Sequence, residues 1–266
     1  MLKIVVCVKA VPDPNKADKV RIDPKTKRLN RVDIPLVINP LDKHALEAAL
    51  QLKAKLGVEI SVISMGPAEA GNVVIECLAY GAEYGYLLSD PAFAAADAYA
   101  TAYTLACAIK KLGSFDLVFC GRESSDGATE WVGPELAMFL DWPVVTMVKE
   151  ILESSSTHMI VKASIEGGYR IVKVMLPAVV TVTRELNVPR PLSFSSILKA
   201  RNKQISVLNY HDLELLPEQV GEKGSPTIVT ELEYLEETRA CEMIEGNLDE
   251  KAEGIIQVLV RKGVLQ

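Results

Sequence analysis

A strand, a turn and a helix follow one another in residues 58–81, which read VEISVISMGPAEAGNVVIECLAYG. The β-branched run over residues 58–64 predicts a buried strand. Met65-Gly66-Pro67 predicts the turn, with Pro67 suited to a first helical position. Four apolar residues then recur at helical spacing: Val73, Val74, Cys77 and Leu78. Gly81 is typical of a helix end, so this stretch predicts one repeating unit of an α/β fold.

The same alternation continues on both sides of this unit. Further strands are predicted at residues 2–8, 84–88 and 117–120. One helix is predicted to begin at a cap, Asn39 or Asp42, and to end at Gly57. Two more helices are predicted over residues 95–112 and 130–140. Strands separated by such helices require a parallel sheet with flanking helices and right-handed crossovers. In these sheets ligands bind beyond the carboxyl ends of the strands.

The pattern changes after Trp142-Pro143. Residues 159–164, 170–175 and 178–183 read as extended segments and predict an antiparallel addition to the same domain. Residues 21–29 predict a small hairpin or loop excursion. From about Pro189 the periodicity weakens until a last helix near residues 248–261. We therefore expect an α/β domain over residues 1–195 and a C-terminal extension, or arm, over residues 196–266.

Charge is distributed unevenly along the chain. The formal net charge is -6, yet residues 212–253 alone hold 13 acidic and three basic side chains. Such an acidic segment can lie on a partner protein or on its own core, and both alternatives stay open. An acidic chain of this kind favours neither nucleic acid nor an anionic membrane as its partner.

The motifs that the sequence lacks exclude several classes of protein. Five cysteines without C-x-x-C spacing predict reduced thiols, most of them buried, and a cytoplasmic protein without an export signal. Residues 91–109 contain Asp97, Thr101 and Thr104, so they predict a packed helix and no membrane insertion. The three histidines are not at ligand spacing, and no metal site is expected. Hydrolase-elbow, P-loop and G-x-G-x-x-G motifs do not occur.

Residues 120–134, CGRESSDGATEWVGP, leave a predicted strand and enter a predicted helix. Gly127 allows close approach of a ligand, the free N–H groups of the helix start can hold a phosphate, and Thr129 adds a hydroxyl. The alternative is an ordinary βα loop capped by Asp126 or Thr129. Asn39-Pro40-Leu41-Asp42 and Ser64-Met65-Gly66-Pro67 occupy two other strand-to-helix passages. Three such loops on one rim of a sheet favour a nucleotide crevice.

These residues resemble the beta subunit of electron transfer flavoproteins over nearly the whole chain. The resemblance rests on residues 6–13, on Asn39-Pro40-Leu41-Asp42 with residues 45–47, on residues 166–170 with 176–182, and on residues 187–190. Two positions depart from the family pattern, which usually has Gln or Glu at Arg170 and an acid at Ala128. The departures concern side-chain contacts around the nucleotide and leave a backbone phosphate site intact.

The resemblance implies an adenine nucleotide alpha hydrolase-like fold, a heterodimer with an alpha subunit that carries another FAD, and electron exchange with a dehydrogenase. Housekeeping relatives hold AMP in the beta subunit, whereas electron-bifurcating relatives hold FAD, which takes a hydride from NADH and sends electrons along two paths, one to ferredoxin. Similarity to the bifurcating pattern rests on Asp126-Gly127-Ala128-Thr129, on Val132-Gly133-Pro134, and on Leu87-Leu88-Ser89-Asp90, Phe93, Asp97 and Ala100-Thr101. A non-redox adenine-nucleotide module and a structural subunit with bound AMP remain the alternatives.

The resemblance also implies which residues contact the cofactor. Gly121, Asp126, Gly127, Thr129, Val132 and Gly133 are expected at the pyrophosphate and ribityl part, and Cys7, Lys9, Asn39, Pro40 and Met65 at the adenosine side. Cys7 and Met65 could equally be core side chains, and Trp131 could flank a flavin or lie in the core or an interface. The full set expected to bind FAD, or AMP in its place, adds Leu41, Asp42, Gly66, Asp90, Cys120, Arg122, Ala128 and Pro134.

No catalytic acid–base residue is expected, because the flavin supplies the chemistry. An acyl-CoA or enoyl-CoA dehydrogenase, or a lactate dehydrogenase, is the expected partner enzyme, and the C-terminal extension is expected to contact the alpha subunit.

Overall fold

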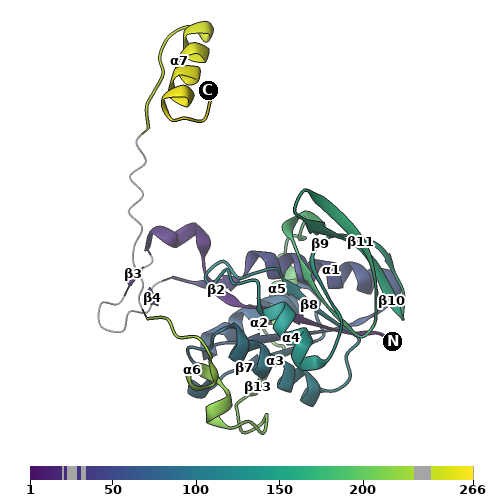
Figure 1. The fold of residues 1–266 in the computed structure, drawn as a ribbon. Coiled ribbons are helices and arrows are strands. Elements are labelled where there is room, and N and C mark those ends of the chain that lie inside the picture. The colour runs from purple at the N-terminus through teal and green to yellow at the C-terminus, as the bar shows by residue number, and fades with distance from the viewer. Residues whose placement is uncertain (20, 23–28, 31–33, 231–240, 266) are drawn as a thin grey trace. The chain divides into compact units, whose positions relative to one another are not determined.

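The computed structural model describes the chain except for residues 20, 23–28, 31–33, 231–240 and 266 (Figure 1). The contacts within the chain divide it into two compact units, Met1–Thr230 and Glu231–Gln266. The first unit contains the sheet and its helices, and the described part of the second contains one helix.

Among the described residues, nine strands form the main sheet, in the order β11-β10-β9-β12-β8-β1-β6-β7-β13. β1 (Lys3–Cys7), β6 (Glu59–Met65), β7 (Tyr84–Leu88), β8 (Leu117–Gly121), β12 (Ala178–Val182) and β13 (Ser206–Leu208) run parallel. β9 (Val144–Ser154) is parallel to β12 and is followed by the antiparallel strands β10 (His158–Ile165) and β11 (Gly168–Met175). The predicted class, α/β with a parallel sheet and an antiparallel addition, is confirmed.

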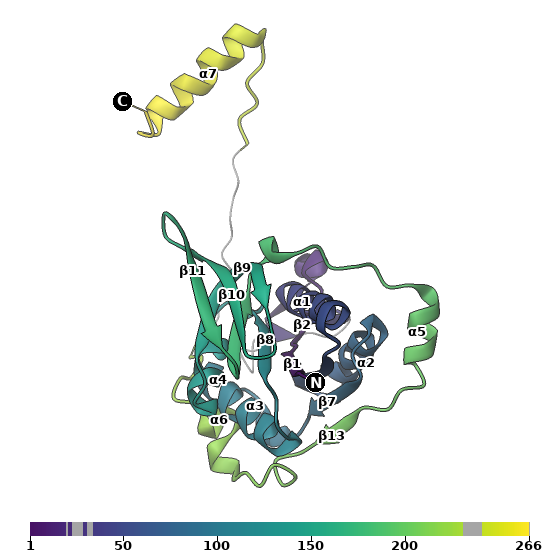
Figure 2. The same cartoon turned by 90° about the vertical axis from the view of Figure 1, so that its right-hand side faces the viewer.

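Helices cover both faces of the sheet. Figure 2 shows α1 (Pro40–Leu56) and α2 (Gly71–Tyr80) on one side, and α3 (Ala98–Leu112) and α4 (Val132–Leu140) on the other. Successive side chains of β1 therefore point to opposite helical layers. Ile4 and Val6 belong to the core under α1 and α2, whereas Val5 belongs to the core under α3 and α4. The chain builds β1, β6 and β7 in one direction and then returns to place β8 on the other side of β1. The topological switch point therefore lies between β1 and β8.

Shorter elements connect these layers. β2 (Ala10–Pro12) pairs antiparallel with β5 (Leu36–Ile38), and β3 (Arg21–Ile22) pairs antiparallel with β4 (Leu29–Asn30). The latter pair agrees with the predicted hairpin, whose turn lies outside the described residues. The remaining short helices are η1 (Pro14–Lys19), η2 (Ala68–Ala70), η3 (Pro91–Phe93), η4 (Arg184–Leu186), α5 (Phe194–Ala200), η5 (Pro217–Gln219) and α6 (Gly221–Gly224). None of the helices in the described ranges is both long and apolar enough to cross a membrane.

Three details differ from the sequence prediction. Pro67 is extended and precedes η2, and α2 begins only at Gly71, so Pro67 is not a first helical residue. The segment expected to be antiparallel at residues 178–183 is β12, a parallel strand between β8 and β9. α3 and α4 each begin later than predicted, because Ala95 and Glu130 have left-handed backbone conformations, with φ of 59° and 61°, which a right-handed helix cannot include.

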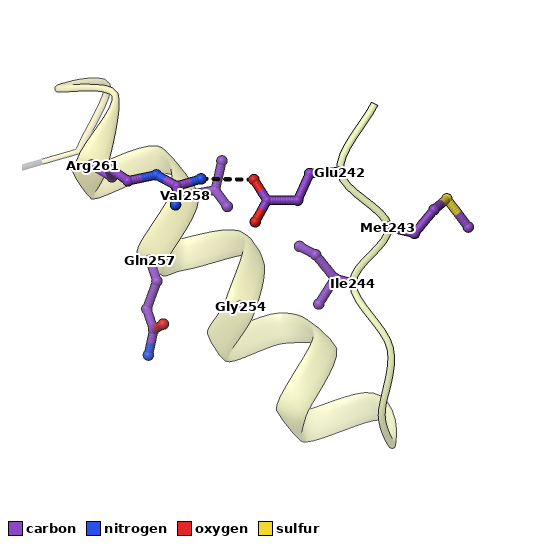
Figure 3. A pocket seen from close by; sticks show the side chains of 7 residues that line it. All are labelled: Glu242, Met243, Ile244, Gly254, Gln257, Val258 and Arg261. Atoms are coloured by element: carbon purple, nitrogen blue, oxygen red, sulfur yellow. Dashed lines mark hydrogen bonds and ion pairs between the residues drawn. The ribbon is translucent and has the colours of Figure 1, made fainter. Parts of the chain in front are cut away.

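The first part of the expected C-terminal extension lies in the first unit. β13 pairs with β7, and Leu213, Leu215 and Val220 are buried in the core under α3 and α4. In the second unit α7 (Leu248–Arg261) has the predicted bounds, and Asn247 and Glu250 form a capping box at its start. Residues 242–244 run beside α7, where Glu242 pairs with Arg261 at 2.7 Å and Ile244 packs on Gly254, leaving a hollow of about 360 Å³ (Figure 3).

Candidate functional site

The switch point brings the ends of β1 and β8 next to the start of α1. β1 ends at Cys7 and β8 ends at Gly121, and the two strands are hydrogen-bonded neighbours. A loop over residues 122–131, called here the β8–α4 loop, follows β8 and leads into α4. All of these lie at the carboxyl edge of the sheet, where α/β proteins bind their ligands.

Asn39 connects α1 to the β8–α4 loop. It occupies the N-cap position of α1 as predicted, but its side chain makes no capping hydrogen bond. Instead, its Nδ2 donates to the carbonyl oxygen of Glu123 at 2.8 Å, and its Oδ1 accepts from the backbone N–H of Ser125 at 3.0 Å. Asn39 is only 1% exposed. Its amide therefore fixes the first residues of the loop against the start of α1.

Asp42 connects the ends of the two strands. Its Oδ2 accepts from the backbone N–H of Lys9 at 2.8 Å, and its Oδ1 accepts from the backbone N–H of Gly121 at 3.0 Å. Burial raises the pKa of Asp42 to about 6. The two backbone N–H donors lower this pKa, as do the side chain of Asn39 and the charge of Lys9, but they do not cancel the effect of burial. A Cβ at Gly121 would lie 2.4 Å from Oδ1, so only glycine fits there. Asp42 is thus a bridging residue, and neither it nor Asn39 caps α1 with its side chain.

A lysine and an aspartate pair across the switch point. Lys9 Nζ lies 2.6 Å from Asp126 Oδ1 and donates to Ser124 Oγ at 3.3 Å. A Cβ at Gly127 would lie 3.1 Å from Ser124 Oγ and 3.8 Å from Lys9 Nζ. The glycine therefore keeps open the space between the ammonium group and the loop.

The backbone of the β8–α4 loop is left-handed at Ala128 and Glu130, with φ of 47° and 61°. Trp131, and neither Asp126 nor Thr129, holds the N-cap position of α4, and the side chain of Trp131 makes no capping bond. Thr129 Oγ1 accepts only a long contact of 3.5 Å from the N–H of Trp131. Within the described part of the chain, the backbone hydrogen bonds of loops and caps give the N–H groups of Val132 and Gly133 no carbonyl acceptor. Such donors at a helix start are suited to an anion.

The other predicted residues lie nearby but bond elsewhere. Gly66 donates to the carbonyl of Leu88 at 3.0 Å, and Asp90 Oδ1 accepts from the N–H of Ala92 at 2.8 Å, which caps η3. Met65 and Val132 are partly buried against the core under α3 and α4, and Pro134 is half-buried. Cys7 and Cys120 are buried in that core, and the Cys7 thiol together with burial raises the pKa of Cys120. Trp131 is 62% exposed, so it is not a core residue.

The cysteines as a whole agree with reduced thiols. All five are free; Cys7, Cys77 and Cys120 are buried, Cys107 is half-buried and Cys241 is exposed.

A pocket of about 240 Å³ lies between the start of α1 and the β8–α4 loop. Its lining comprises Asn39, Pro40, Leu41, Glu123, Ser124, Ser125 and Ala128. Glu123, Ser124 and Ser125 were not among the predicted contacts. They follow Arg122 in the sequence, and their position between the strand end and Gly127 was the signal that could have indicated them.

Together, the doubly wound sheet and the pocket at its switch point define an α/β protein of the nucleotide-binding type. Comparison with known proteins identifies the family. The family model "Electron transfer flavoprotein domain" matches residues 26–213. The chain is 44% identical over 99% of its length, and all of the relative's, to an electron transfer flavoprotein subunit beta of Thermoanaerobacterium thermosaccharolyticum. It therefore belongs to the electron transfer flavoprotein family, as a beta subunit.

Two further relatives are subunits of reductase complexes. The caffeyl-CoA reductase-Etf complex subunit CarD of Acetobacterium woodii is 41% identical over 99% of this chain and all of its own length. The acryloyl-CoA reductase electron transfer subunit gamma of Anaerotignum propionicum is 35% identical over 99% of this chain and all of its own length.

Proposed function

We propose that this beta subunit binds FAD in the crevice between the start of α1 and the β8–α4 loop, and that it is of the electron-bifurcating type. A bound flavin would supply the redox chemistry, namely hydride acceptance from NADH and single-electron transfer to ferredoxin and, through the alpha-subunit FAD, to a partner dehydrogenase. The observation that carries the proposal is the convergence of two helix starts, Lys9 and Gly127 on the switch point of the sheet.

The residues present fit a dinucleotide phosphate. The uncapped start of α4 offers the N–H groups of Val132 and Gly133, and Lys9 supplies a positive charge beside Gly127. Two left-handed residues, Ala128 and Glu130, give the loop a strained backbone of the kind that is concentrated at ligand-binding sites. This chain's own residues would thus bind and orient the nucleotide, and no proton-transferring side chain is required.

AMP is the second candidate ligand, and the size of the pocket favours it. About 240 Å³ is below the roughly 300–1,000 Å³ typical of small-molecule sites. A mononucleotide would need less space than FAD, whose remainder would have to extend beyond this pocket. In that case the chain would be the beta subunit of a single-path electron carrier.

The proposed partners follow from the family and from the relatives. An alpha subunit would complete the heterodimer, and the C-terminal extension would contact it. The names of two relatives, which refer to caffeyl-CoA and acryloyl-CoA reductases, support an acyl-CoA or enoyl-CoA dehydrogenase as the partner enzyme. A lactate dehydrogenase is the alternative.

The test is to purify the heterodimer, release its ligands by denaturation, and count FAD and AMP by chromatography. We expect two FAD and no AMP per heterodimer, with NADH bleaching the flavin; one FAD and one AMP would establish the single-path carrier instead. Gly127→Leu should lower the count to one FAD, because its side chain enters the space beside Lys9 Nζ. Gly168→Leu is the control, since a Cβ there meets no atom within 4 Å. Unchanged flavin in Gly127→Leu would contradict the assignment of this loop.

A further inference from the structure

The β8–α4 loop ends in a conformation that its residue does not favour. Glu130 has a φ of 61°, a left-handed backbone that costs free energy in any residue with a Cβ. Its peptide group leads directly into Trp131 and the uncapped start of α4. A residue held in this way persists only where surrounding contacts stabilise it.

Arg122 provides such a contact from the other end of the loop. Its backbone N–H donates to the carbonyl of Val182 at 2.9 Å, which fixes Arg122 to the end of β12. Its guanidinium pairs with Glu123 through Nη2, and its Nε lies 3.2 Å from Glu130 Oε1. The first and last parts of the loop are therefore joined through a cation that is anchored in the sheet.

The Nε atom of Arg122 is buried, and no acceptor in the described ranges meets it with good hydrogen-bond geometry. The Glu130 carboxylate is therefore paired with it mainly by charge. A buried N–H group without a hydrogen-bond acceptor is costly. The charge of the Glu130 carboxylate offsets part of this cost for Arg122 Nε, and loss of the carboxylate would remove that offset. The side chains of Arg122 and Glu130 are 35% and 40% exposed, which limits the strength of the pair.

We infer that Glu130 is a positioning residue: through Arg122 it holds the left-handed end of the β8–α4 loop, and so keeps the N–H groups at the start of α4 in place for the phosphates. This inference rests on the proposed function, since it assigns Glu130 to the same nucleotide site. Glu130 does not need to contact the nucleotide itself.

The experiment measures FAD binding by the heterodimer after the beta site has been emptied, with FAD as the probe and flavin fluorescence as the signal. Glu130→Gln keeps the size of the side chain and removes its charge, and we expect binding about fivefold weaker, which corresponds to about 1 kcal/mol. Glu130→Asp retains a carboxylate and a residue type that tolerates left-handed backbone, so it should bind within about twofold of the original chain. Glu130→Gly should fall between these, because it removes the backbone strain together with the charge.

Glu185→Gln is the matched control. Glu185 also acts on Arg122 by charge, but it follows β12 and lies outside the loop. We expect its FAD binding to be unchanged, and the thermal midpoints of Glu130→Gln and Glu185→Gln to lie within about 4 °C of the original chain's. Equal binding by Glu130→Gln and the original chain, or equal weakening by Glu185→Gln, would overturn the inference. A starting heterodimer that holds neither FAD nor AMP and binds no added FAD would overturn the proposed function instead.

Discussion

At the scale of single residues, the side chain that decides the shape of the crevice is Asp42. It bonds the N–H of Lys9 and the N–H of Gly121, which is 79 positions away in the sequence. Burial raises its pKa from the ordinary 3.8 to about 6, so its ionised form is less stable in the folded chain than in the unfolded chain. The folded protein tolerates this because both carboxylate oxygens accept a backbone N–H.

The raised pKa makes the free energy of unfolding depend on pH in a defined direction. Below pH 3.8 Asp42 is protonated in both states and contributes nothing; as the pH rises towards 6 only the unfolded state releases the proton, so stability falls, by about 3 kcal/mol in total. Asp42→Asn cannot ionise, and relative to it the original chain should lose this amount between pH 4 and 7.5 in urea unfolding. Asp116→Asn is the control, because half-buried Asp116 accepts the N–H of Lys3 at the other end of the same two strands. Parallel curves for the original chain and Asp42→Asn would contradict the prediction.

The residue types at this site were predictable from the sequence, but their bonds were not. Local patterns correctly placed Asn39 and Asp42 at the start of a helix and Gly121 at the end of a strand. They suggested that Asn39 or Asp42 would cap the helix, since capping is the local use of an Asn or Asp side chain. In the structure, both side chains instead bond to residues that are 33 or more positions away in the sequence. These long-range contacts depend on the order of strands in the sheet.

At the scale of elements, α4 can approach β12 closely because Gly133 has no side chain. A Cβ at Gly133 would lie 2.3 Å from Thr181 Cγ2, well inside van der Waals contact. Gly133→Ala should therefore destabilise the protein by about 2 kcal/mol, as overpacked sites do, measured by urea unfolding. Thr181→Ser removes Cγ2 and keeps the hydroxyl that accepts from the N–H of Met147, so the double variant should recover most of the loss. Gly168→Ala, in open space, should change stability by less than about 0.5 kcal/mol.

Failure of Thr181→Ser to restore stability would show that the contact with Thr181 Cγ2 is not what requires glycine at position 133. Elements with a regular period were the ones that the sequence predicted well: β7 and α7 have the predicted bounds. β9 was missed because Met147, with φ of 57°, interrupts its alternation. β13 was missed because a strand of three residues carries no detectable period, and its pairing with β7 depends on the rest of the sheet.

At the scale of the whole molecule, the chain divides after Thr230 and not where its periodicity weakens. Residues 196–230 place β13 on the sheet and bury Leu213, Leu215 and Val220, so removing them would disturb the core. The sequence could not indicate this, because such segments lack helical or strand period and are recruited by contacts made elsewhere. Deletion from residue 197 onward is expected to abolish heterodimer formation, but it would also damage the first unit.

A chain that ends at Thr230 separates these two effects. It keeps the whole first unit, including the Asp97 side chain that accepts from Thr227, so its thermal midpoint should stay within about 2 °C of the full chain's. It lacks α7, on which Ile255, Ile256 and Val260 are each about half exposed, an apolar surface suited to a partner. We therefore expect the shortened chain to lose co-purification with the alpha subunit while it remains folded. A shortened chain that still co-purified in full yield would place the alpha-subunit contact within residues 1–230, whereas a large drop in its thermal midpoint would show that the second unit also stabilises the first.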